Sequence, residues 1–121
     1  MDPTRQFIVM IDSDQHASTI VDLVVAGLTE AVRVKSNSFD YKGNSCELLV
    51  NDEADSDLVS QPDGFFHYKY ELQVTPLKNK PMVDQIEVAR GMCELIADSI
   101  SDKFVLCANF EDSLPQFGPT A

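Results

Sequence analysis

The residues best suited to chemistry form a run of acidic side chains near the middle of the chain. Four carboxylates fall within six positions, at Asp52, Glu53, Asp55 and Asp57. Almost no core-forming residue accompanies them between Asn51 and Asp63, so we expect an exposed loop. Exposed carboxylates can hold a hard metal ion, bind the Lys and Arg side chains of a partner, or remain solvated.

The spacing of this run bears on the metal alternative. Glu53, Asp55 and Asp57 stand at alternate positions, as do the first three ligands of an EF-hand calcium loop. Leu58, however, occupies the position where that loop requires Gly, and Gly64 occupies the position of its bidentate Glu. We therefore expect no metal site. Our functional hypothesis treats the run as a docking surface for a basic partner, with a solvated loop as the alternative.

Histidine is the commonest general base in catalysis, and the chain has two, His16 and His67. His16 falls in the first turn of a predicted helix, and His67 lies on the mixed face of a predicted strand. The sequence contains no G-x-S-x-G, no H-E-x-x-H and no phosphate-binding glycine motif. We expect no catalytic residues, no cofactor and no enzymatic activity.

The three cysteines indicate a reducing compartment. Cys46, Cys93 and Cys107 are odd in number and form no C-x-x-C pair, which predicts reduced, buried thiols rather than disulfides or a zinc site. Near the N-terminus the longest apolar run is Phe7 to Ile11, which is too short for a signal peptide or a membrane span. We expect a cytoplasmic protein that does not insert into membranes.

Length and charge narrow the class further. The chain has 121 residues, 44% of them hydrophobic, which fits one globular domain over residues 1–121. Its 20 acidic residues exceed its 9 Lys and Arg, giving a formal net charge of -11. Such a charge argues against nucleic acid and anionic membranes as partners, because both attract clustered Lys and Arg. It favours a basic protein partner.

Hydrophobic periodicity supplies the elements that would position the acidic run. The expected strands cover residues 6–11, 46–51, 65–76 and 103–110, and one further strand runs from Val32 into a turn at residues 41–44. The expected helices cover residues 15–32 and 81–101. The two helices should bury Ile20, Val24, Leu28, Ile86, Ala89 and Cys93. The tail, about residues 113–121, should be irregular.

The order of these elements predicts an α+β domain. Two helices would pack on one face of a four- to five-stranded, mainly antiparallel sheet, in the ferredoxin-like order β-α-β-β-α-β. The strands at residues 6–11 and 103–110 are apolar on both faces, so we expect them to be neighbours in the centre of the sheet.

Two segments carry a family resemblance. The sequence D-G-F-F-H-Y-K-Y-E-L from Asp63 to Leu72, leading to Pro76, and C-A-N-F-E-D from Cys107 to Asp112 resemble small acidic bacterial immunity proteins of polymorphic-toxin and contact-dependent growth inhibition systems. The resemblance covers about a third of the chain. It implies a cytoplasmic protein that binds one cognate toxin domain and blocks its active site.

The functional hypothesis combines this resemblance with the charge. The expected function is that of a non-enzymatic immunity or antitoxin-like protein, which occludes a basic toxin domain such as a nuclease. The predicted partner-binding residues comprise the acidic run, the neighbouring turn and the start of the tail: Asp52, Glu53, Asp55, Asp57, Asp40, Tyr41, Glu111 and Asp112. The alternative is a small-ligand-binding or regulatory module of ferredoxin-like fold.

Overall fold

The computed structural model describes residues 6–52, 54, 55, 57–59, 64–77, 81–100 and 103–108. The elements follow one another as β1 (Phe7–Ile11), α1 (Ala17–Gly27), β2 (Val32–Lys35), β3 (Ser38–Tyr41), β4 (Asn44–Val50), the 3-10 helix η2 (Gly64–His67), β5 (Tyr70–Pro76), α2 (Met82–Ser99) and β6 (Phe104–Ala108).

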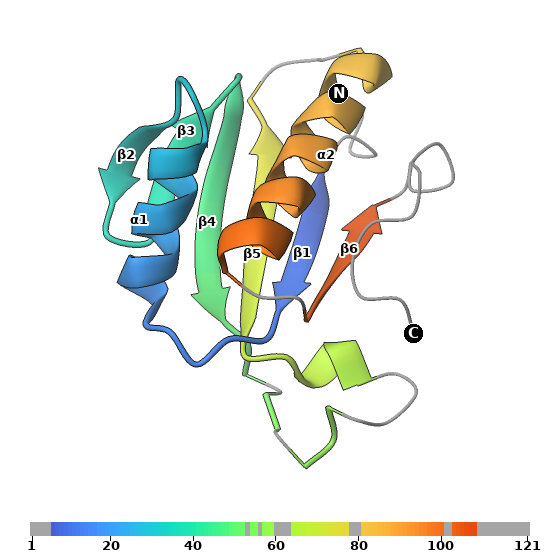
Figure 1. Cartoon of the computed structure of the whole chain (residues 1–121). Coiled ribbons are helices and arrows are strands. Elements are labelled where there is room, and N and C mark those ends of the chain that lie inside the picture. Colours follow the sequence, from blue (N-terminus) through green and yellow to red (C-terminus); the bar gives the residue numbers. More distant parts are fainter. Residues whose placement is uncertain are drawn as a thin grey trace.

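These strands form one six-stranded sheet in the order β2-β3-β4-β5-β1-β6, and every neighbouring pair is antiparallel. Both α-helices lie on the same side of the sheet (Figure 1). The α+β class is therefore confirmed. The predicted number of strands is wrong, because the sheet has six strands rather than four or five.

The extra strand is β3, because the stretch from Val32 to the turn at residues 41–44, predicted to be one strand, forms two paired strands, β2 and β3. Phe39 and Tyr41 are buried there, while Asp40 between them is exposed, so the stretch has the alternation of a strand. Lys42 and Gly43 both have positive φ angles, 47° and 78°, which suits the two-residue turn of a tight hairpin. The chain order β-α-β-β-β-β-α-β consequently departs from the predicted β-α-β-β-α-β.

The first and last strands are neighbours, as predicted, but β6 is not central. β1 pairs with β6 on one side and with β5 on the other, and β6 ends the strand order. Phe104 and Leu106 are buried, whereas Val105 and Cys107 are only half-buried. An apolar edge strand with one covered face therefore has the same sequence pattern as a central strand.

Two other segments differ from their predicted form. Helix α1 ends at Gly27 rather than near Val32, and the chain then turns through Glu30, whose φ is 77°. The predicted strand at residues 65–76 begins instead with η2. The first residue of η2 is Gly64. A Cβ atom at this position would lie 1.8 Å from the carbonyl oxygen of Val59. This close approach requires glycine.

The core lies between the helices and the sheet. The strands contribute residues that share the helix-covered face, including Val9, Leu72 and Val74, all at most 1% exposed. Five of the six residues expected to point inward from the helices are buried: Ile20, Val24, Leu28, Ala89 and Cys93. Ile86, the sixth, is half-buried at the margin of this core.

Two of the thiols belong to this core. Cys46 and Cys93 are fully buried, and burial raises the pKa of each thiol to about 12. Cys107 is half-buried on β6. No disulfide joins these three described cysteines, and the prediction that all three are buried is wrong for Cys107.

Candidate docking loop

The acidic run follows β4 and is attached to the rest of the fold at its first residue. The backbone N–H of Asn51 donates to the carbonyl oxygen of Lys69 at 2.8 Å. The Asn51 side-chain amide donates to the carbonyl oxygen of Tyr68, also at 2.8 Å. The loop therefore leaves the sheet with its direction fixed by β5 and the residues that precede β5.

A series of hydrogen bonds orders the described part of the loop beyond Asn51. The N–H of Ala54 donates to the Asn51 carbonyl at 3.1 Å, and the N–H of Asp55 donates to the His67 carbonyl of η2 at 3.1 Å. The Asp55 carboxylate then accepts from the N–H of Asp57 at 2.9 Å. The backbone is thus attached to η2 as well as to β4, which limits the motion of the acidic side chains relative to the sheet.

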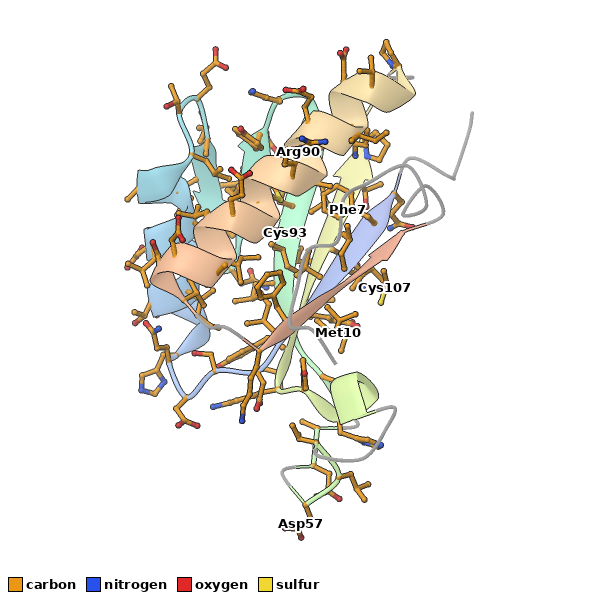
Figure 2. All side chains as sticks on the ribbon, turned by 45° about the vertical axis from the view of Figure 1, so that its right-hand side comes forward. Phe7, Met10, Asp57, Arg90, Cys93 and Cys107 are labelled. Carbon is orange, nitrogen blue, oxygen red and sulfur yellow. The ribbon has the colours of Figure 1, made fainter. Side chains whose placement is uncertain are left out.

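Three carboxylates of the run are exposed in this arrangement. Asp52, Asp55 and Asp57 all lie at the surface, and Asp57 stands at the far end of the loop (Figure 2). Within the described residues, no Lys or Arg side chain forms a salt bridge with these three. Glu53 lies outside the described residues. The loop therefore presents unneutralised negative charge to solvent.

Two apolar side chains accompany this charge. Val50, the last residue of β4, is 62% exposed, and Leu58 is 37% exposed. In the sequence, Val50 precedes the acidic residues and Leu58 follows them. This part of the surface therefore exposes aliphatic side chains as well as carboxylates. We call the set Val50, Asp52, Asp55, Asp57 and Leu58 the docking loop.

Two of the other predicted contact residues, Asp40 and Tyr41, are separate from the docking loop. Asp40 is exposed on β3, next to the β3–β4 turn, whereas the docking loop follows the opposite end of β4 (Figure 1). A strand of this length separates them by roughly 20 Å. Tyr41 is only 7% exposed and belongs to the core. Glu111 and Asp112 lie outside the described residues.

Sequence reasoning missed the apolar part and the anchors of the docking loop. Val50 continues an apolar strand pattern, so nothing in the sequence signals its exposure. The bond from Asn51 to Tyr68 joins residues 17 positions apart, and local patterns do not reveal such a pairing. The turn signal before η2 did mark Gly64, but not its contact with Val59.

A second acidic surface runs along α2. Four exposed carboxylates lie within roughly 80° of one another around the helix: Asp84, Glu87, Glu94 and Asp98. Their spacing was visible in the sequence, which predicted a solvated acidic face. This surface provides charge-matched control positions for tests of the docking loop.

Neither metal binding nor a membrane span finds support in the described residues. Among them, no group of three or more His, Cys, Asp or Glu side chains is placed to hold a metal ion. No helix in these parts of the chain is long and apolar enough to cross a membrane. Comparisons with models of protein families, with curated proteins and with solved structures find no match to this chain.

Proposed function

We propose that the chain is a non-enzymatic, cytoplasmic immunity or antitoxin-like protein of bacterial origin. It would bind a cognate basic toxin domain, such as a nuclease, and occlude its active site. The observation that carries the proposal is the docking loop, whose exposed carboxylates have no basic partner among the described residues and are held on a hydrogen-bonded backbone.

The two chemical components of the docking loop would act at different stages of binding. Asp52, Asp55 and Asp57 would attract a cationic cleft over a distance and accelerate the encounter. Val50 and Leu58 would then lose water against the partner and slow dissociation. An ordered backbone reduces the conformational entropy lost on binding, so the loop suits a stable complex.

A co-expression experiment tests this proposal. The C-terminal domain encoded by the adjoining upstream reading frame is expressed in bacteria with and without this chain, and colony survival is counted. The proposal predicts that the domain alone kills, that co-expression restores survival, and that the two proteins co-purify. Equal killing with and without the chain, despite normal expression of both proteins, would count against it.

The fold proposal is finer than the α+β class. We propose that β1, β4, β5 and β6 form a ferredoxin-like unit with α1 and α2, extended at one edge by β2 and β3. Support comes from the order β4-β5-β1-β6 and from the placement of both helices on one face. A solved structure that superposes on ferredoxin-like domains over these strands and helices would test it.

A further inference from the structure

One face of the sheet carries a stripe of apolar side chains beside a line of acidic side chains. Helices α1 and α2 cover only one face of the sheet (Figure 1). We propose that the opposite face, called here the open face, is a docking site for a basic amphipathic helix of a protein partner. This inference does not depend on the docking loop, which lies beyond one end of the sheet.

Strand register defines the open face as rows of side chains that run across the strands. One row contains Lys35, Ser38, Glu47, Gln73, Ile8 and Cys107. The next row toward the docking loop contains Leu49, Glu71, Met10 and Val105. The next row on the other side contains Val32, Asp40, Ser45 and Thr75.

Each of these rows holds one carboxylate, on a different strand. Asp40 lies on β3, Glu47 on β4 and Glu71 on β5, so the three form a diagonal across the sheet. Strand spacing and residue rise place consecutive members about 8 Å apart. Asp40 and Glu47 are exposed and Glu71 is half-buried. These three rows of the described strands contain one basic residue, Lys35, which is exposed on β2 at the edge of the sheet and lies two strands from Glu47.

Apolar side chains lie beside this diagonal on β1 and β6, while Leu49 on β4 and Val32 on β2 lie among the carboxylates. Ile8 on β1 and Val105 on β6 are half-buried, although neither α1 nor α2 covers them. Met10 is 7% exposed at the end of this stripe where η2 contacts β1. Figure 2 shows Met10 and Cys107 on these two neighbouring strands. The stripe is two strands wide, about 10 Å, which matches the diameter of an α-helix.

Charge and shape together specify the occupant. A helix lying along β1 and β6 would place apolar side chains on Ile8 and Val105. Lys or Arg on the flank above β5 and β4 would reach Glu71 and Glu47. A second copy of this chain is disfavoured as the occupant, because its open face would bring the same three carboxylates. The partner helix is therefore apolar on one side and basic on the neighbouring side.

Nuclear magnetic resonance maps this interaction on the full chain. The probe is a synthetic amphipathic helical peptide of about 14 residues, with Leu on one face and Lys on its flanks. A peptide of the same composition with Leu and Lys evenly distributed is the control. We expect amide shifts in β1, β5 and β6, and binding at least about tenfold tighter than that of the control peptide.

Charge variants then separate recognition from general attraction. The open-face variant carries Asp40→Asn, Glu47→Gln and Glu71→Gln, and the matched variant carries Asp84→Asn, Glu87→Gln and Glu94→Gln on α2. We expect the open-face variant to lose about tenfold or more in affinity for the peptide, and the matched variant less than about threefold.

Several results would overturn the proposal. They are an absence of binding, equal losses in the two variants, or peptide-induced shifts confined to α2 or the docking loop. Nuclear Overhauser contacts in the free protein between residues 109–121 and β1 or β6 would also overturn it, because the chain itself would then occupy the face. None of these results bears on protection from a toxin, which tests the docking loop separately.

Discussion

At the scale of single residues, the fold depends on an amide pair that the sequence pattern does not reveal. Asn44 and Gln85 are both fully buried. The Gln85 side chain donates to Asn44 Oδ1 at 2.8 Å, and the Asn44 side chain donates to Gln85 Oε1 at 3.2 Å. Asn44 also donates to the carbonyl oxygens of Tyr41 and Lys42. The pair therefore joins the β3–β4 hairpin to α2.

Removing one member of this amide pair should destabilise the protein. Gln85→Met keeps the length of the side chain but removes the hydrogen bonds to Asn44, and an unsatisfied buried amide costs about 1 to 3 kcal/mol. The half-buried Gln73 is the control, and Gln73→Met should cost under about 0.5 kcal/mol. Urea unfolding measures both free energies. Equal values for the two variants would show that the buried pair does not stabilise the fold.

The buried thiols should make stability depend on alkaline pH. The folded pKa of Cys46 and of Cys93 is about 12, above the ordinary value of 9.0. The unfolded chain therefore loses these protons first, and stability that is complete below about pH 9 falls as the pH rises toward 12. We expect a loss of roughly 1 kcal/mol per thiol between about pH 9 and pH 10.

Unfolding by urea under reducing conditions at a series of pH values measures this loss. The control is the double variant Cys46→Ala and Cys93→Ala, in which the contribution of these thiols to the pH dependence should disappear. A parent protein and double variant with the same slope between pH 9 and 10 would contradict the raised pKa values.

At the scale of elements, α2 packs on the sheet through a line of residues that the sequence located only in part. Ala89 and Cys93 are buried as predicted, but Met92 is also fully buried, and Ile86 is only half-buried. Met92→Ala should therefore cost about 2 to 5 kcal/mol through lost transfer free energy and a cavity. Ile86→Ala should cost less, about 1 to 2 kcal/mol, in the same urea experiment. The opposite ranking would mean that the helix is rotated about its axis.

Elements with strong periodicity were predictable, and elements stabilised by pairing were not. The pattern of alternate apolar residues located β5, and the spacing of three and four located both helices. The division of residues 32–41 into β2 and β3 was missed, because the turn at Ser36 and Asn37 contains no Gly or Pro to mark it. η2 was missed because the apolar alternation of β5 continues back through Tyr68 and Phe66 in the sequence.

At the scale of the whole molecule, the formal charge of -11 is distributed over several surfaces. The docking loop, the outer side of α2 and the open face each carry at least three exposed or half-buried carboxylates. Sequence alone could locate the acidic run because charge and apolar content are local properties. It could not show that Asp40 lies far from the run, because that separation depends on the direction of β4.

The association rate with the basic toxin domain tests the central claim most directly. Stopped-flow kinetics over a salt series compare the parent with two variants that each lose three charges. The loop variant carries Asp52→Asn, Asp55→Asn and Asp57→Asn, and the α2 variant carries Asp84→Asn, Glu94→Gln and Asp98→Asn. Surface carboxylates contribute little to folding, so each variant should unfold within about 1 kcal/mol of the parent.

The docking loop predicts a local effect of charge. The loop variant should associate about tenfold or more slowly at low salt, and its difference from the parent should shrink above about 0.15 M salt. The α2 variant should slow by less than about threefold, because its charges lie farther from the interface. If the loop variant binds as fast as the parent at every salt concentration, or both variants slow equally, the loop is not the docking surface.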